Sequence, residues 1–235
     1  MPVREHRFEA VEAEVLQRCG PAWVAGIDEA GRGPLAGPVS VGLCIFEPDF
    51  FFQAMPEELA GLRDSKRCPP NRRAFLQGSI RRLARFSTTV LAGNRLIDRM
   101  GISRAIEWAI LAALERARRA GCLPRAVLFD GKHLYPALPR TFPEVEFQTH
   151  VGGDDRILSI AAASILAKEC RDRRMQRYDR LFPGYDLPEH KGYATRAHRD
   201  ALERLGPSPL HRRTFLGFLK PDESQPELDF SGLDS

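Results

Sequence analysis

Short apolar segments alternate along this chain with longer segments of helical periodicity, and this alternation limits the fold more than any other feature. The clearest helix is predicted over residues 102–120, where small and branched apolar side chains recur every three or four positions on one face. Other helices are expected over residues 71–85, 157–178 and 194–205. Expected strands, which share an apolar composition, span residues 23–27, 38–45, 86–91, 126–129 and 145–149. Strands that alternate with helices predict an α/β fold, with a mixed β-sheet flanked by helices.

Four parts can be distinguished along the chain. Residues 1–20 are predicted to be an N-terminal helical segment, and residues 21–180 the main α/β domain. Residues 181–220 are expected to add a C-terminal extension that is helical or irregular. Residues 221–235 are predicted to be a disordered acidic tail. Within the main domain, residues 46–62 contain two prolines and an acidic stretch, and we expect them to run over the surface.

The distribution of charge is uneven. The whole chain has a formal net charge of +4, but the tail after residue 220 contains five acidic residues and no basic one. Residues 1–220 therefore carry a net charge of +9, which suits a polyanionic partner such as a nucleic acid. Composition alone supports equally well an alternative in which the excess charge only keeps the protein soluble.

Neither a membrane nor an oxidising compartment is indicated. The chain lacks an apolar run near the length of a membrane span, and its first ten residues lack an apolar signal core, so we expect a cytoplasmic protein without a membrane partner. The cysteines are odd in number and form no CxxC pair, which predicts reduced packing residues rather than disulfides or a zinc site. They are Cys19, Cys44, Cys68, Cys122 and Cys170.

Three predicted apolar segments are followed by acidic residues: Asp28-Glu29, Asp130, and Asp154-Asp155. Carboxylates from different strand ends can converge at one edge of a sheet, where their oxygens suit Mg²⁺ or Mn²⁺. Taken singly, each position has a simpler interpretation, because an aspartate before glycine often forms a turn and an aspartate before a helix often caps it. Spacing alone therefore indicates only an acidic site that can hold metal.

The segment at residues 26–39, GIDEAGRGPLAGPV, is more specific. The carboxylate pair Asp28-Glu29 is followed almost directly by Gly31-Arg32-Gly33. Glycines allow a backbone to pass close to a nucleic acid strand and to present its N–H groups to phosphates or hydroxyls. A lone GxG would be a weak signal, but the fourteen-residue block is a strong one.

With this block and the motifs that follow it, the chain resembles the type 2 ribonucleases H, the family of bacterial ribonuclease HII. The resemblance runs from Ala25 to about Leu216, and the motifs occur in the order of the family. Beyond the first block they are Asp64-Ser65-Lys66, Ile97-Asp98, LFDGK at residues 128–132, SIAAASILAKECRD at 159–172, HKGYAT at 190–195, and His211-Arg212. The resemblance implies a ribonuclease H-like catalytic domain over residues 21–180, with the extension contacting substrate.

The resemblance also implies the catalytic site. The four catalytic and metal-binding carboxylates of the family match Asp28, Glu29, Asp130 and Asp154. Asp155 competes for the last role, but the distance to the small residues at 161–164 favours Asp154. The family usually has a lysine two residues before this aspartate, where this chain has Gly152, so the contact of that lysine is absent or is supplied by Arg156.

Substrate-binding residues follow in the same way. Gly31, Arg32 and Gly33 match the loop that reads the ribose 2′-hydroxyl in the family, and this hydroxyl distinguishes RNA from DNA. Tyr193 matches the aromatic residue at that ribose, although a tyrosine considered alone is more often a packing residue. Ser65 and Lys66 match residues near a backbone phosphate, although an isolated lysine is more often simply exposed.

The implied activity is hydrolysis of the RNA strand of RNA/DNA hybrids, and nicking of duplex DNA 5′ to a single ribonucleotide, leaving 5′-phosphate and 3′-hydroxyl ends. Two Mg²⁺ or Mn²⁺ ions would serve in-line attack by water, and the protein is expected to act as a monomer. Two alternatives remain open. One is a DNA-directed nuclease of similar architecture, which would have no 2′-hydroxyl to read. The other is a hybrid-binding protein without activity, which would not need four acids.

Overall fold

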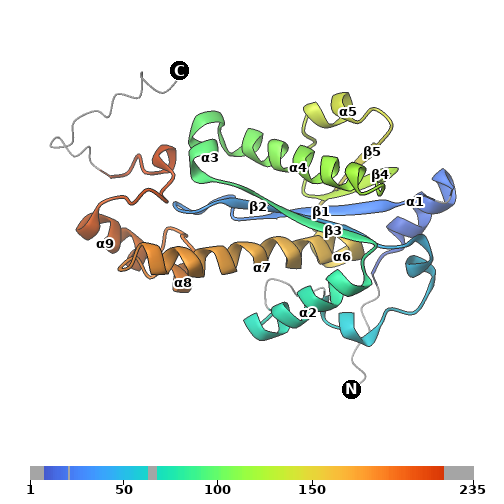
Figure 1. Ribbon diagram of the computed structural model, residues 1–235, viewed down its shortest axis with the longest axis horizontal. Coiled ribbons are helices and arrows are strands. Elements are labelled where there is room, and N and C mark those ends of the chain that lie inside the picture. The colour runs from blue at the N-terminus through green and yellow to red at the C-terminus, as the bar shows by residue number, and fades with distance from the viewer. Residues whose placement is uncertain (1–7, 21, 63–67, 220–235) are drawn as a thin grey trace.

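The computed structural model describes residues 8–20, 22–62 and 68–219. Within these ranges, five strands form one mixed sheet in the order β3-β2-β1-β4-β5 (Figure 1). The strands are β1 (Val24–Ala30), β2 (Val39–Ile45), β3 (Phe86–Ala92), β4 (Ala126–Asp130) and β5 (Glu146–His150). β2 is antiparallel to both β1 and β3, whereas β1, β4 and β5 are mutually parallel. The predicted α/β fold with a mixed sheet is confirmed.

Helices cover both faces of this sheet. The helix α4 (Ile102–Arg119) lies on one face and the long α7 (Leu158–Leu181) on the other, with α2 (Pro70–Leu83) packed outside α7 (Figure 1). The remaining α-helices are α1 (Val11–Cys19), α3 (Asn94–Met100), α5 (Ala137–Thr141), α6 (Gly153–Arg156), α8 (Leu187–His190) and α9 (Arg196–Leu205). Short 3₁₀ helices span Pro48–Phe52, Glu57–Leu59 and Arg213–Phe215. In the described part of the chain, none of these helices has the length and apolar character needed to cross a membrane.

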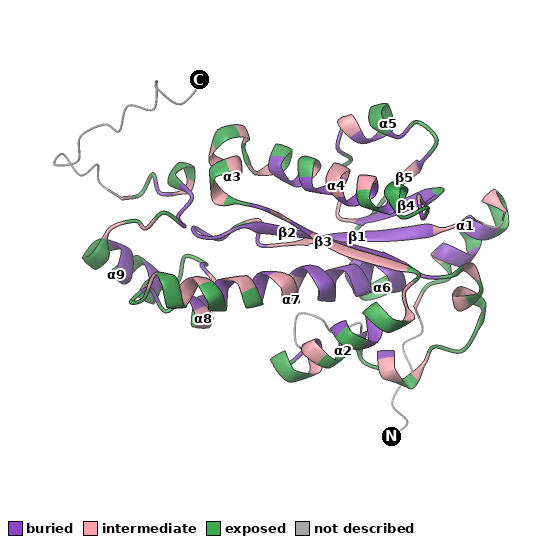
Figure 2. Cartoon of the chain, viewed as in Figure 1, coloured by how far each residue is buried: buried purple, intermediate pink, exposed green. Residues whose placement is uncertain are grey.

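The apolar stripe of α4 builds the core on its side of the sheet. Ala105, Ile106, Ala109, Ile110 and Ala113 are fully buried against side chains of the strands. Figure 2 colours the buried residues of the chain purple, and the central strands are mostly of this kind. Small and branched residues alternate along this stripe, which lets the helix lie close to the pleated surface. The prediction for residues 102–120 was therefore correct to within one residue.

On the opposite face, α7 lies directly on the backbone of the two central strands. A Cβ atom at Gly26 of β1 would meet backbone atoms of Ser159 and Ile160, and one at Gly42 of β2 would meet the carbonyl of Ala163, all inside the 3.0 Å that real Cβ atoms keep. The run of small residues at 161–163 makes this approach possible from the side of the helix. The start of α7 is thus fixed against the strand that carries Asp28.

Residues 46–62 are mostly exposed, as predicted, but they are not only a surface excursion. Phe46, Leu59 and Leu62 are fully buried with residues of α2 and α7 in a second apolar cluster. The sequence pattern did not show this because Pro48 and Pro56 interrupt the segment between Phe46 and Leu59, so the three side chains follow no regular period. Strand β1 also runs three residues past its predicted end, since Asp28, Glu29 and Ala30 pair with Gly42, Val41 and Ser40 of β2.

The C-terminal extension packs on the far half of α7. Met175 of α7 joins Leu35, Tyr185, Leu187 and Leu202 in a separate apolar cluster. One helix therefore contacts the sheet with its first half and the extension with its second half (Figure 1). The predicted disordered tail and the first seven residues lie outside the described residues.

Candidate active site

Two of the predicted carboxylates leave the sheet side by side. Strands β1 and β4 are parallel and pair Ile27 with Phe129, so Asp28 and Asp130 occupy the next matching positions. Both follow residues that pack toward α4, and the alternation of a strand turns their side chains to the α7 face. Parallel pairing thus brings two acids, which are about one hundred residues apart in the chain, to one point.

Asp154 completes a cluster of three carboxylates. It lies buried in α6, directly after β5, and the neighbouring Gly153 N–H donates a 2.8 Å hydrogen bond to Oδ1 of Asp130. One carboxylate oxygen each from Asp28, Asp130 and Asp154 lies within 4.8 Å of the other two. This all-oxygen donor set fits a hard divalent cation such as Mg²⁺ or Mn²⁺.

Glu29 is placed differently from the other three predicted carboxylates. It is still within β1, so its side chain leaves the opposite face of the strand from Asp28, and it is not a member of the three-carboxylate cluster. Its Oε1 accepts a 3.3 Å ion-pair hydrogen bond from Nη1 of Arg32. Arg32 in turn donates to the Ser103 hydroxyl and contacts the buried Tyr135. Glu29 therefore links the acidic cluster to the glycine-rich loop.

Burial and mutual repulsion give the acids unusual proton affinities. Burial raises the pKa of Asp28 to about 8, and the charges of Glu29 and Asp130 add to this effect. Hydrogen bonds from the Ser164 hydroxyl and the Glu29 N–H act in the opposite direction. Burial also raises the pKa of Glu29, partly offset by Arg32. A cation would relieve this repulsion directly.

We expect the stabilisation of the protein by Mg²⁺ or Mn²⁺ to increase with pH. Since the pKa of Asp28 is raised from its ordinary value of 3.8 to about 8, the folded state holds a proton that the unfolded chain releases. Without metal, stability therefore falls as the pH rises through this interval. A cation needs the ionised carboxylate, so its apparent affinity rises until about pH 8. Thermal shifts with each metal at about pH 6 and pH 8.5 measure this effect.

Asp155→Asn is the matched control for this measurement, because Asp155 is exposed and lies outside the cluster. Its thermal shift should match that of the unmodified protein at both pH values, whereas Asp28→Asn should show little shift at either. Equal shifts in all three proteins would mean that the metal binds elsewhere.

The glycine-rich loop begins where β1 ends. Gly31 has φ +94°, and a Cβ atom there would collide with the guanidinium of Arg171, so the loop needs glycine for two reasons. Gly33 is exposed, and a Cβ atom there would meet nothing within 4 Å. The loop therefore lies beside Glu29, with its Gly33 end open to solvent. Ser65 and Lys66 lie outside the described residues.

At Gly152, where the resembling family has lysine, the backbone has φ +67°, a conformation that favours glycine. In this structure Arg156 has other partners. It forms a two-pronged ion pair with Glu9, at 2.7 and 2.8 Å, and donates to the Val151 carbonyl. Arg156 thus ties α6 to the segment before α1, and its replacement of this lysine at a bound nucleic acid stays a prediction.

Tyr193 is exposed rather than packed in the core. Its side chain is 47% exposed, and the guanidinium of Arg171 lies 5.8 Å from the ring centroid. Its backbone carbonyl accepts a 2.9 Å hydrogen bond from Nδ1 of His198, whose Nε2 lies 3.0 Å from Nε2 of His211. Because Nδ1 of His211 accepts from the Ser208 N–H, one set of neutral tautomers satisfies the whole chain of hydrogen bonds. These histidines anchor the backbone of Tyr193.

The contacts of two buried arginines in this region were not predicted from the sequence. Arg171 is buried and donates to the carbonyls of Pro38, Ala36 and Lys191. Arg212 is fully buried behind the glycine-rich loop. Both belong to motifs of the resemblance, but their neighbours are distant in the chain, so the sequence alone could not show what they contact.

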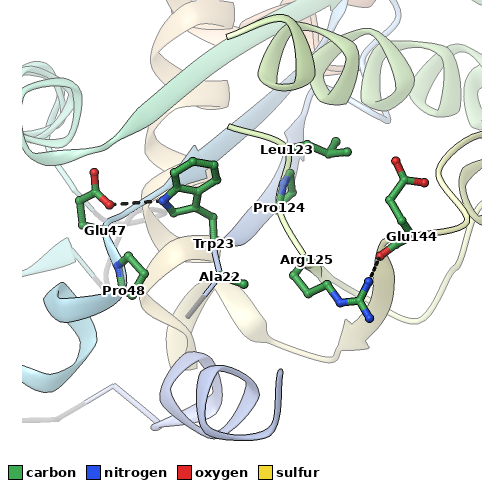
Figure 3. A pocket seen from close by; sticks show the side chains of 8 residues that line it. All are labelled: Ala22, Trp23, Glu47, Pro48, Leu123, Pro124, Arg125 and Glu144. Atoms are coloured by element: carbon green, nitrogen blue, oxygen red, sulfur yellow. Dashed lines mark hydrogen bonds between the residues drawn. The ribbon is translucent and has the colours of Figure 1, made fainter. Parts of the chain in front are cut away.

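Among the described residues, two of the hollows lie outside the acidic cluster. One, of about 440 Å³, is lined by Trp23, Glu47, Leu123, Pro124 and Arg125, among others, at the opposite ends of β1 and β4 from the carboxylates (Figure 3). The other, of about 510 Å³, lies between α4 and α5 and includes the Arg32 partners Ser103 and Tyr135. Only the second adjoins the site.

Three comparisons with known proteins bear on the family and the fold of this chain. The family model of ribonuclease HII matches residues 25–217. A ribonuclease HII of Moorella thermoacetica is 46% identical over 211 residues, which cover 89% of this chain and 95% of the relative. The crystal structure of ribonuclease H2 from Pyrococcus horikoshii OT3 shares the fold, with a TM-score of 0.63 and 24% identity over 82% of this chain and 93% of that one.

A third comparison concerns a more distant structure. A Bst ribonuclease HIII solved in complex with Mn²⁺ has a TM-score of 0.57 and 18% identity, over 87% of this chain and 68% of that chain. The predicted ribonuclease H-like fold is thus confirmed by two solved structures. The match of the family model over most of the chain and the identity to its curated relatives lead to one conclusion: this chain belongs to the ribonuclease HII family of endoribonucleases.

Proposed function

We propose that this protein hydrolyses the RNA strand of RNA/DNA hybrids and nicks duplex DNA 5′ to a single embedded ribonucleotide, leaving 5′-phosphate and 3′-hydroxyl ends. The observation that best supports this proposal is a convergence of two features. One oxygen each from the carboxylates of Asp28, Asp130 and Asp154 lies within 4.8 Å of the other two. Strand β1, which carries Asp28, continues directly into the glycine-rich loop. The first feature suits phosphodiester hydrolysis, and the second suits close approach of a ribose.

Asp28, Asp130 and Asp154 would hold two divalent ions, Mg²⁺ or Mn²⁺. When bound, such ions supply activation of the attacking water and neutralisation of charge on the leaving oxygen. Glu29 is proposed as the fourth ligand, exchanging its contact with Arg32 for a contact with cation. Parallel pairing and α7 hold Asp28 and Asp130 in register, so Glu29 is the acid that would have to rearrange when cation and substrate bind.

Recognition of the ribose is proposed for Gly31, Arg32, Gly33 and Tyr193. Only the 2′-hydroxyl distinguishes a ribonucleotide from its neighbours in DNA, and backbone N–H groups can bond to it. The exposed ring of Tyr193 would pack on this sugar, held by Arg171 and the His198 hydrogen bond. Ser65 and Lys66 are proposed as phosphate contacts.

The proposal also covers the domains, the salt dependence of binding, the oligomeric state and the location of the protein. Residues 21–180 would form the catalytic domain, and residues 181–220 an extension that contacts the nucleic acid. The net positive charge of residues 1–220 predicts that affinity falls steeply with salt. We further propose that the protein acts as a monomer in the cytoplasm.

A direct test compares three duplexes of one sequence: all DNA, DNA with one ribonucleotide, and an RNA/DNA hybrid. With Mg²⁺ or Mn²⁺ we expect cleavage of the last two, with the nick 5′ to the single ribonucleotide, and no cleavage with chelator present. Cutting of the all-DNA duplex at a similar rate would favour a DNA-directed nuclease. Binding of the hybrid without cleavage in any metal would favour a binding protein.

A further inference from the structure

The glycine-rich loop is held from behind by one buried arginine. The guanidinium of Arg212 donates three hydrogen bonds to carbonyl oxygens of this loop: Nη2 to Gly31 at 2.6 Å, Nη1 to Arg32 at 2.9 Å, and Nε to Gly37 at 3.0 Å. Arg212 is 0% exposed. The backbone N–H of Arg212 also donates to the Leu35 carbonyl, at 2.8 Å. One side chain from the C-terminal extension thus binds both the start of the loop, at Gly31 and Arg32, and its end, at Gly37.

This arrangement is electrostatically unusual. Among the described residues, no carboxylate forms an ion pair with Arg212. Its charge is met by the three loop carbonyls, by the ring of Phe215, whose centroid lies 5.2 Å from the guanidinium carbon, and at longer range by Asp98. Burial and the neighbouring Arg171 lower the pKa of Arg212 to about 9, which leaves the group protonated at neutral pH. A buried charge without an ion-pair partner is costly, and an arginine needed only for packing could be replaced by an apolar residue.

The hydrogen bonds to Arg212 fix the direction of the neighbouring N–H groups. The described peptide bonds are all trans, so each carbonyl points away from the N–H of the same peptide unit. With the carbonyls of Gly31 and Arg32 turned inward, the N–H groups of Arg32 and Gly33 must point outward. Within the described residues, neither N–H donates a hydrogen bond to another group. A positive charge behind these peptide units also strengthens their N–H groups as donors.

We propose that Arg212 is a positioning residue for sugar discrimination: by binding the carbonyls of Gly31 and Arg32, it directs the N–H groups of Arg32 and Gly33 toward the ribose 2′-hydroxyl. This inference rests on the proposed function and assigns a cause to the specificity of the same site. It places the source of that specificity in the C-terminal extension, 180 residues from the loop in the chain.

Binding measured without cleavage separates the proposed role of Arg212 in sugar discrimination from any role in catalysis. In Ca²⁺, the affinity for a duplex with one ribonucleotide is compared with the affinity for the same duplex made entirely of DNA. The discrimination ratio is the dissociation constant for the all-DNA duplex divided by that for the ribonucleotide-containing duplex. This ratio does not depend on the fraction of protein that is folded, because that fraction scales both dissociation constants equally. We expect Arg212→Lys and Arg212→Gln to lower this ratio about tenfold, since aligned hydrogen bonds to the 2′-hydroxyl are lost.

Arg213→Gln is the matched control, because Arg213 is the adjacent residue and is exposed. Its loss should weaken binding of both duplexes alike and leave the ratio unchanged. An unchanged ratio in both Arg212 variants would overturn the inference and leave Arg212 a stability residue. If the unmodified protein itself shows no ratio above one, and cuts neither ribose-containing duplex, the proposed function fails instead.

A second measurement needs no variant and covers the case in which both Arg212 variants are unfolded. Amide hydrogen exchange of Arg32 and Gly33 should be rapid in the free protein, slow with the ribonucleotide-containing duplex, and less affected by the all-DNA duplex. Protection of both amides in the free protein, or equal protection by the two duplexes, would contradict outward-directed N–H groups.

Discussion

Asp28→Asn is expected to lower the rate of cleavage of a ribonucleotide-containing duplex by about a thousandfold or more. Asparagine keeps the shape of the side chain but removes the negative charge of one member of the three-carboxylate cluster. A loss of roughly 4 kcal/mol of transition-state stabilisation is reasonable for a disrupted metal site and corresponds to that factor. Single-turnover cleavage assays with Mg²⁺ and with Mn²⁺ measure the change.

The stability of this variant separates the loss of chemistry from a loss of fold. Burial raises the pKa of Asp28 to about 8, so an ionised Asp28 is unfavourable without metal, and Asp28→Asn should be at least as stable as the unmodified protein in chelator at about pH 8.5. Asp155→Asn, which changes an exposed acid one residue from Asp154, should keep normal activity. Cleavage by Asp28→Asn within tenfold of normal would contradict the proposed site.

Gly26→Ala is expected to destabilise the fold by roughly 3 kcal/mol or more. The added methyl group would meet the backbone of Ser159 and Ile160, and neither α7 nor β1 can move without disturbing other contacts. For a chain of this length, such a change lowers the melting temperature by about 6–12 °C. Thermal unfolding followed by circular dichroism is a sufficient measurement.

Gly78→Ala provides the opposite result in the same chain. Gly78 is exposed within α2, and a Cβ atom there would meet nothing within 4 Å. Alanine favours the helix more than glycine does, so this change should stabilise the protein by about 0.5–1 kcal/mol. If both substitutions shifted the melting temperature by similar amounts, the close contact between α7 and β1 would be in doubt.

The fold could be predicted where a periodic pattern was long. The stripe from Ile102 to Arg119 has many repeats, and its helix was placed to within one residue. The helices α3, α5 and α8 were missed because seven residues or fewer show no clear period, and such elements form only when the rest of the chain packs on them. The end of β1 was missed because pairing with β2, rather than composition, extends it to Ala30.

The site was predicted in outline for a similar reason. Acids after apolar segments indicated a shared sheet edge, and parallel pairing of β1 with β4 brings Asp28 and Asp130 there. The direction of Glu29 depended on whether it lay in a strand or in a turn, which the sequence left undetermined. The contacts of Arg212 could not be predicted, because they join residues 180 positions apart.

The continuity of α7 has a mechanical consequence. A rigid rod of 24 residues, seated on Gly26 and Gly42 at one end and on Leu35 and Leu202 at the other, leaves no hinge between the acids and the segment that carries Tyr193. Under the proposed function, α7 would therefore hold the metal-binding acids and the ribose-binding Tyr193 at a fixed separation, and this separation would set the position of the cut relative to the ribonucleotide.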